Sequence, residues 1–356
     1  MANIKDLLNL CIEHNASDLH LTQNTPPVLR VDGRLVLFNE FGLLDKDQMK
    51  KCIYGFLNDR QIEKFEQERE LDFSLSLEGM PRFRVNIHVQ RGAVEAAFRL
   101  IPAKIPSVSQ LGLPPVIIDF ARKPSGLVLI TGPTGAGKTT TLASMIDLIN
   151  GERSCMIMCI EDPIEYIHQN KKSVIKQREV YSDTKSFAEA LKRCLRQDPD
   201  VIVVGEMRDL ETISTALTAA ETGHLVLATL HTPDAAQTVE RIVDVFPPHQ
   251  QQQVRLQLSA CLQGIISQIL LPRAQGKGRV LASEVLVATP AIRNLIREEA
   301  VEQIPTTIQT GGQYGMHTMD MSLKLLCQKK IIAYEDAVGQ AKNVQEFKQL
   351  LNNSEF

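Results

Sequence analysis

The decapeptide GPTGAGKTTT, from Gly132 to Thr141, has the residue types and the spacing of a phosphate-binding loop. It fits the pattern G-x-x-x-x-G-K-[S/T], in which glycines let backbone N–H groups turn toward phosphate oxygens. GLVLI precedes the loop and TLASMIDLI follows it, so the loop is expected between a strand and the N-terminal end of a helix, which attracts anions. A glycine-rich turn without a ligand is the plainer alternative. The full motif in this setting favours a nucleotide site.

The motif gives roles to individual residues of the loop. Lys138 is expected to reach the β- and γ-phosphates, and the hydroxyl of Thr139 is expected to bind Mg²⁺. The predicted nucleotide-binding residues are those of the loop and of the first turn after it: Gly132, Pro133, Thr134, Gly135, Ala136, Gly137, Lys138, Thr139 and Thr140.

Two acidic residues that follow short apolar runs are candidates for the hydrolytic chemistry. Glu206 comes just after VIVVG, and Glu161 comes at the end of CMIMCI. The carboxyl ends of parallel strands meet at one edge of a sheet, beside the phosphate loop. Hydrolysis needs an acid that positions the attacking water, and Mg²⁺ binds carboxylates directly or through water. The residues alone do not divide these roles, and Glu161-Asp162-Pro163 could also cap a turn.

The segment TGHLVLATLHT carries His224 and His231 at the two ends of one predicted strand. At the rise of a strand the two imidazoles are ~23 Å apart, which excludes a shared metal ion. His231, at the carboxyl end, is the candidate for sensing the γ-phosphate. His224 is expected either to be structural or to face a neighbouring molecule.

The composition is that of a globular protein without a global preference for polyanions. The chain has 356 residues, a net charge of −3 and a pI of about 6.3; nucleic acid is therefore not an expected direct partner, and two domains are expected. The seven scattered cysteines, which lack paired zinc spacing, are expected to be buried free thiols in a reducing compartment.

Neither a membrane span nor a signal peptide is expected. No apolar run approaches the ~18 residues that cross a bilayer. The N-terminal segment instead spaces Ile4, Leu7, Leu8 and Cys11 along one face of a helix. A cytoplasmic protein is therefore expected.

The chain is expected to have a strand-rich first part and an α/β second part. Before the segment IPAKIPSVSQLGLPP, VLRVDGRLVLF predicts a hairpin turning at Asp32-Gly33, and RFRVNIHV predicts a strand with Arg82 and Arg84 on its polar face. After it, apolar runs alternate with helical segments, which favours a parallel sheet covered on both faces. The predicted limits are 1–102 for the first domain, 103–116 for a linker, 117–289 for the α/β core and 290–356 for a helical C-terminal region.

Four segments in their order and spacing resemble the secretion-superfamily ATPases that power type IV pili and type II and type IV secretion: the phosphate loop, EDPIE, GEMRD and GHLVLATLHT. ASDLHL and VLRVDGRL are similar to the small N-terminal domain of that superfamily. The resemblance covers essentially the whole chain. It implies an α/β protein with an N-terminal PAS-like α+β domain, a RecA-like P-loop NTPase domain and a helical C-terminal tail.

AIRNLIRE, residues 291–298, resembles the signature of pilus-retraction ATPases, and IQTGGQYGMHTMDMSL resembles the segment that follows it there. EEAVEQ, just after the signature, departs from the retraction pattern. By periodicity alone, AIRNLIRE is an amphipathic helix with Ile292, Leu295 and Ile296 on its apolar face. The resemblance implies a surface needed for retraction but not for ATP hydrolysis. The polar face is predicted to carry Arg293, Asn294, Arg297 and Glu298.

The resemblance implies a homohexamer that holds ATP and Mg²⁺ between the N-terminal domain of one subunit and the RecA-like domain of the next. It implies that Glu161 is the general base and that Glu206 supports Mg²⁺ and water. Arg82, Arg84 and Arg99 become candidate arginine fingers, with a solvated strand face as the alternative.

The expected location is the cytoplasmic side of the inner membrane, at the base of a pilus. The expected partner there is an inner-membrane platform protein, and a second retraction ATPase is left open. Pilus extension, type II secretion and DNA uptake are alternative uses of the same core. A nucleotide-gated binding subunit is a further alternative, although it has no need of Lys138, Thr139, Glu161 and Glu206 together.

Overall fold

The computed structural model describes residues 3–31, 33–101, 104–276 and 278–352. The chain divides into two compact units: Met1–Lys104 with Pro163–Ile167, and Ile105–Asp162 with His168–Phe356. Pro102, the predicted end of the first domain, and Ala103, the predicted start of the linker, lie outside the described residues. Later in the predicted linker, Val108 and Leu113 are buried in the core of the second unit.

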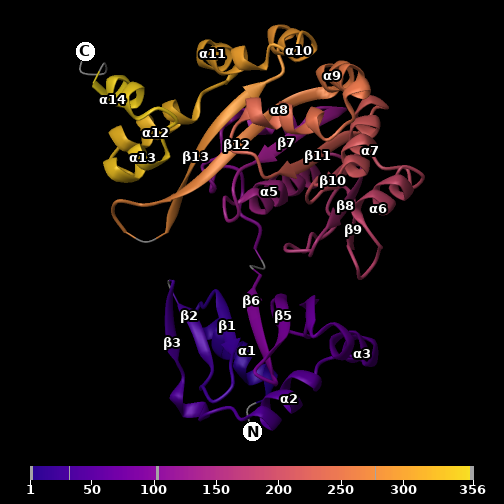
Figure 1. Ribbon diagram of the computed structural model, residues 1–356, viewed down its shortest axis with the longest axis vertical. Coiled ribbons are helices and arrows are strands. Elements are labelled where there is room, and N and C mark those ends of the chain that lie inside the picture. The colour runs from indigo at the N-terminus through magenta and orange to yellow at the C-terminus, as the bar shows by residue number, and fades with distance from the viewer. Residues whose placement is uncertain (1–2, 32, 102–103, 277, 353–356) are drawn as a thin grey trace. The chain divides into compact units, whose positions relative to one another are not determined.

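The first unit is a six-stranded antiparallel sheet with the order β3-β2-β1-β6-β5-β4 (Figure 1). Its strands are β1 (Asp18–Leu21), β2 (Val28–Val31), β3 (Arg34–Leu37), β4 (Glu70–Leu75), β5 (Phe83–Gln90) and β6 (Ala93–Leu100). Its helices are α1 (Ile4–Glu13), η1 (Asn39–Phe41), α2 (Lys46–Tyr54) and α3 (Asp59–Glu68). The predicted apolar face of α1 is confirmed, since Ile4, Leu7, Leu8 and Cys11 are its buried residues.

Helices α2 and α3 are absent from the sequence prediction, which expected mainly strands here. Each begins with a capping box, at Asp45 with Gln48 and at Asn58 with Gln61. In each box the N-cap side chain accepts a hydrogen bond from the backbone N–H of the third helical residue. The side chain of that third residue accepts one from the backbone N–H of the N-cap residue. The signal was therefore present in the sequence at both sites.

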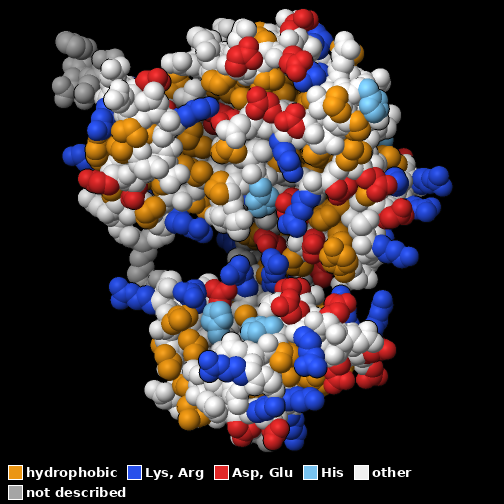
Figure 2. All heavy atoms as spheres, in the orientation of Figure 1, with side chains coloured by type: hydrophobic (Ala, Val, Ile, Leu, Met, Phe, Trp, Pro, Cys, Tyr) orange, Lys and Arg blue, Asp and Glu red, His pale blue; other side chains and the backbone are white. Residues whose placement is uncertain are grey.

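One face of this sheet is polar, as the alternation in RFRVNIHV predicts. Phe83, Val85 and Ile87 are buried, whereas Arg84 and Asn86 are half-buried on the other face. The predicted hairpin is confirmed in the antiparallel pairing of β2 with β3; of its turn residues, Asp32 lies outside the described residues. Hydrophobic side chains lie exposed over the β3 edge of the sheet (Figure 2).

The second unit contains a seven-stranded sheet with the order β13-β12-β7-β11-β10-β8-β9. All neighbours in it are parallel except β12 and β13. The strands are β7 (Gly126–Thr131), β8 (Met156–Glu161), β9 (Val174–Glu179), β10 (Val201–Val204), β11 (Leu225–Leu230), β12 (Leu262–Pro272) and β13 (Arg279–Val287). The helices between them are α4 (Val116–Ala121), α5 (Lys138–Glu152), α6 (Phe187–Cys194), α7 (Leu210–Glu221), α8 (Ala235–Asp244) and α9 (Pro248–Cys261).

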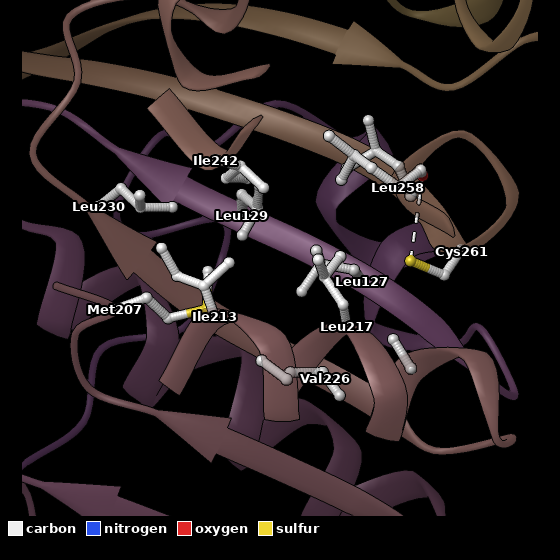
Figure 3. Packing of buried hydrophobic residues seen from close by; sticks show 14 of the residues in the cluster. Leu127, Leu129, Met207, Ile213, Leu217, Val226, Leu230, Ile242, Leu258 and Cys261 are labelled. Carbon is white, nitrogen blue, oxygen red and sulfur yellow. Dashed lines mark hydrogen bonds between the residues drawn. The ribbon is translucent and has the colours of Figure 1, made fainter. Parts of the chain in front are cut away.

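The central strands are apolar along their whole length because helices cover both faces. Leu127 and Leu129 of β7 pack toward α7, α8 and α9 (Figure 3). Val128 and Ile130 of the same strand pack toward α4 and α5. This arrangement confirms the predicted α/β class: a small α+β domain, then a RecA-like domain.

Beyond β13 the described residues are helical, and the elements are α10 (Pro290–Arg297), η2 (Val301–Gln303), α11 (Ile304–Thr310), η3 (Gly312–Tyr314), α12 (Met319–Gln328), α13 (Tyr334–Gln340) and α14 (Val344–Asn352). In α10, Ile292 and Ile296 are buried. Arg293, on the predicted polar face of this helix, makes contacts that the sequence did not predict. It is half-buried and donates hydrogen bonds to the carbonyls of Ser259 and Ala260 at the end of α9, where a cation is favoured by the helix dipole.

The cysteines and the helix lengths were also the subject of sequence predictions. The seven cysteines are free, but Cys52, Cys155 and Cys327 are partly exposed, so the prediction that all are buried is wrong. Among the helices in the described parts of the chain, none has the length and apolar character to cross a bilayer.

Candidate active site

The phosphate loop joins β7 to α5 in a conformation that requires glycine. Gly132 and Gly137 have φ angles of 138° and 85°, in the region that side chains disfavour. A Cβ on Gly132 would lie 2.2 Å from the carbonyl oxygen of Gln268. No described side chain caps the N-terminus of α5, so its first-turn N–H groups are suited to phosphate oxygens. The loop therefore fits a nucleotide.

Lys138 is the first residue of α5 and is 8% exposed. Its Nζ donates to the carbonyl oxygens of Gly132, at 2.8 Å, and Pro133, at 3.1 Å. Burial lowers the pKa of Lys138, and the charge of Glu206 opposes that shift. Thr139 follows it, half-buried. Of the other predicted loop residues, Pro133, Thr134 and Gly135 are exposed, Ala136 is buried and Thr140 is half-buried.

Glu206 lies two residues beyond β10 and binds two basic side chains. Nε and Nη2 of Arg208 lie 2.7 Å from its two carboxylate oxygens, and Nε2 of His231 lies 3.3 Å from Oε1. Burial raises the pKa of Glu206, but the hydrogen bond from Arg208 and the charges of His231, Arg208 and Lys138 outweigh it, so the pKa is lowered. Lys138, Glu206 and His231 are thus brought together, and a cavity of about 590 Å³ opens beside Glu206 and His231.

Arg208 was not among the predicted site residues. It could have been identified from its position two residues after Glu206 in GEMRD, because this spacing places both side chains in the loop after β10. His224 lies at the other end of β11, where its Nδ1 is 2.9 Å from the carbonyl oxygen of Ala219. This contact favours the structural interpretation of His224.

Glu161 is the last residue of β8, beside the end of β10. The N–H of Gly205 donates to the carbonyl oxygen of Ile160 at 2.8 Å, and a Cβ on Gly205 would lie 3.3 Å from the Cα of Glu161. The close approach brings the two predicted carboxylates to the same edge of the sheet. Nε2 of Gln177, on β9, donates to Oε1 of Glu161 at 2.9 Å.

Strand β12 supports the loop through Gln268, a residue that the sequence did not single out. Its side chain is 1% exposed, and its Nε2 donates to the carbonyl oxygen of Ala136 at 2.7 Å. Its Oε1 accepts a hydrogen bond from the hydroxyl of Thr141 at 3.0 Å. One amide therefore links the loop to the helix that follows it.

We expect the Gln268→Ala variant to bind nucleotide about tenfold more weakly, because two buried hydrogen bonds of about 1 kcal/mol each no longer hold the loop. Titration with a fluorescent ADP analogue measures the change. Gln263→Ala is the matched control, since Gln263 lies at the other end of β12 and binds the carbonyl of Ser125. Equal affinities of the two variants would contradict this role.

The predicted arginines belong to the first unit. Nε of Arg99 donates to Oδ1 of Asp18 at 2.9 Å, although the Arg99 side chain is mostly exposed. Arg84 is the register partner of Arg99 on the neighbouring strand, and it has no ion pair to another described residue. Arg82 precedes β5 and is half-buried.

Comparison with known proteins agrees with this architecture. Residues 72–328 match the family described as Type II/IV secretion system protein. The type IV pilus retraction ATPase PilT of Pseudomonas aeruginosa is 50% identical over 345 residues, which cover 97% of this chain and all of that protein. A twitching motility protein of Neisseria gonorrhoeae is 49% identical over 317 residues, 89% of this chain and 84% of that protein.

The crystal structure of the pilus retraction motor PilT with bound ADP superimposes with a TM-score of 0.93. It is 48% identical and covers 98% of this chain and 100% of its own. The phosphate loop fits a nucleotide, and carboxylates lie at the ends of β8 and β10. The similarity to these relatives extends over the full length of the chain. The chain belongs to the type II/IV secretion system protein family and is an ATPase.

Proposed function

We propose that this chain is the motor ATPase that drives retraction of type IV pili, working as a homohexamer. The observation that carries the proposal is the 50% identity to the Pseudomonas retraction ATPase, which extends over all of that protein. The AIRNLIRE helix supports the same assignment, because it resembles the retraction signature.

Within one site, each side chain has a distinct task. The ammonium group of Lys138 exchanges the carbonyls of Gly132 and Pro133 for β- and γ-phosphate oxygens, and the first-turn N–H groups of α5 bind the same phosphates. Glu161 orients the attacking water and accepts its proton. His231, in contact with Glu206, senses the γ-phosphate.

The oxygen donors near the loop fit Mg²⁺, which prefers hydroxyl, carboxylate and water oxygens. Thr139 would hold the ion directly, and Glu206 would hold it through water while keeping its ion pair with Arg208. When bound, Mg²⁺ supplies positive charge to the β- and γ-phosphate oxygens.

An arginine from a neighbouring subunit completes each site in this proposal. Arg84 is the first candidate, because the guanidinium of Arg99 already pairs with Asp18. We expect Arg84→Ala to lower kcat by at least about 1000-fold, the smaller end of the effects that arginine fingers produce. The steady-state ATPase rate measures this effect.

Mixed hexamers test whether the arginine acts on another subunit's site. Subunits with Arg84→Ala and subunits with Lys138→Ala are each expected to be inactive. Co-expressed, they form some interfaces that combine an intact Arg84 with an intact Lys138, and ATPase activity should return at those interfaces. No recovery in mixed hexamers would contradict action between subunits.

The proposed location is the cytoplasmic side of the inner membrane, at the pilus base. Docking there would be to a platform protein, with no direct contact to nucleic acid. Deletion of the gene in its host tests the function. Retraction predicts abundant pili with loss of surface motility, whereas extension predicts few pili. The native chain should restore motility, and a Glu161→Gln chain should not.

A further inference from the structure

Gln177 contacts the proposed general base from the edge strand of the sheet. β9 pairs with β8 in parallel, and the register places Gln177 opposite Cys159, two residues before Glu161. Side chains two residues apart share one face of a strand. The register therefore puts Gln177 on the same face as Glu161, next to the strand end where hydrolysis is proposed.

Two hydrogen bonds determine the orientation of the Gln177 amide. Its Oε1 accepts a hydrogen bond from the backbone N–H of His168 at 2.9 Å. A backbone N–H can only donate, so the oxygen must face His168. The NH₂ group therefore faces Glu161, and Nε2 donates to Oε1 of Glu161 at 2.9 Å. The reversed amide would set a donor against a donor and an acceptor against a carboxylate.

The same amide links both ends of the segment that follows the base. Residues 162–167 lie between Glu161 and His168, and His168 is 9% exposed. Burial lowers the pKa of His168 to about 4, so its ring is neutral where the enzyme works. Gln177 thus joins a fixed, uncharged point of the chain to the carboxylate of Glu161.

We propose that Gln177 is the positioning residue of the hydrolytic centre, which holds the Glu161 carboxylate ionised and correctly aimed. This inference rests on the proposed role of Glu161. A charge-assisted hydrogen bond to a carboxylate favours its ionised form and limits its rotation. Correct aim matters because a general base acts only on a water within hydrogen-bond reach.

Other titratable groups surround this corner and contribute to its pH dependence. Glu179 of β9 is the register partner of Glu161. Glu206 and Arg208 lie beyond the neighbouring strand β10, and the charge of Asp162 acts on Arg208. These residues are the same in the native chain and in the Gln177 variants. Comparing the pH profiles of the two therefore measures the contribution of Gln177.

The test uses the full-length chain with two substitutions at one position. Gln177→Glu replaces the donor by a second carboxylate, which should move the acidic limb of the pH profile of kcat upward by at least about one pH unit. Gln177→Leu removes the hydrogen bonds to Glu161 and His168 at similar size, and should lower kcat about tenfold with KM within about twofold of native. Lys176→Gln, at an exposed position of the same strand, is the control and should behave as native.

The outcomes separate the inference from the function on which it rests. A Glu161→Gln enzyme at native rate would overturn the role of Glu161, and this inference with it. If Glu161→Gln is inactive but both Gln177 variants keep the native kcat and acidic limb, the inference alone is wrong. Variants that lower only thermal stability, with the acidic limb unmoved, also contradict it, because a purely structural residue would behave in that way.

Discussion

The Glu161→Gln variant should bind ATP normally and hydrolyse it at least about 100-fold more slowly, the usual loss when a general base is removed. The substitution keeps the shape of the side chain and removes the charge that accepts the proton. Its new amide oxygen can still accept the hydrogen bond from Nε2 of Gln177, so the local geometry should survive. The expected loss is therefore in kcat, with little change in KM.

Steady-state phosphate release measures hydrolysis, and binding of a non-hydrolysable ATP analogue measures the affinity separately. The control is Glu211→Gln, which removes an exposed carboxylate that pairs with Lys192 and should leave both quantities unchanged. Hydrolysis by Glu161→Gln at the native rate would refute the assignment of the base. Glu206 would then be the candidate to test next.

The Lys138→Ala variant should lose ATP hydrolysis by at least about 100-fold without losing stability. The ammonium group is the cation of the loop, and its removal leaves the developing charge on the β- and γ-phosphates without its protein partner. Its pKa is lowered by burial, so the charged form is less favourable in the folded chain than in the unfolded one. At neutral pH, relief of this cost should offset the loss of the hydrogen bonds to Gly132 and Pro133, so substitution should leave Tm unchanged or raise it.

Calorimetry and an ATPase assay on the same preparation test this pair of effects. Lys171→Ala is the matched control, since Lys171 is an exposed lysine that pairs with Asp147; activity should be retained. A Lys138→Ala protein with a clearly lower Tm would contradict the argument from burial. One that keeps native activity would contradict the role of the loop.

The features that the sequence predicted are those encoded within a short stretch of chain. The conformation of the loop depends on glycines within a few residues of Lys138, and the apolar face of α1 depends on spacing within one helix. The position of Glu206 follows from the strand just before it. For these, neighbouring residues in the sequence are also the physical partners.

The features that were missed depend on partners far along the chain. Gln268 contacts Ala136 across 132 residues, and the contact exists only because β12 lies beside β7 in the sheet. The contacts of Arg293 with α9 were not predicted, because helical periodicity gives the direction of a side chain and not its neighbour. The capping boxes of α2 and α3 are different, because their signals were local and could have been used.

Because Arg293 is half-buried, the AIRNLIRE signature contains two kinds of position: some residues are needed for the fold, and others only for contacts at the surface. Ile292, Arg293 and Ile296 are constrained by the fold, so substitutions there should lower the amount of intact protein in cells. Asn294 and Arg297 are exposed and hydrogen-bonded to each other, so substitutions there should mainly affect the surfaces that contact this helix. A genetic screen for cells that keep full ATPase levels but cannot move should therefore recover Asn294 and Arg297, and should not recover Arg293.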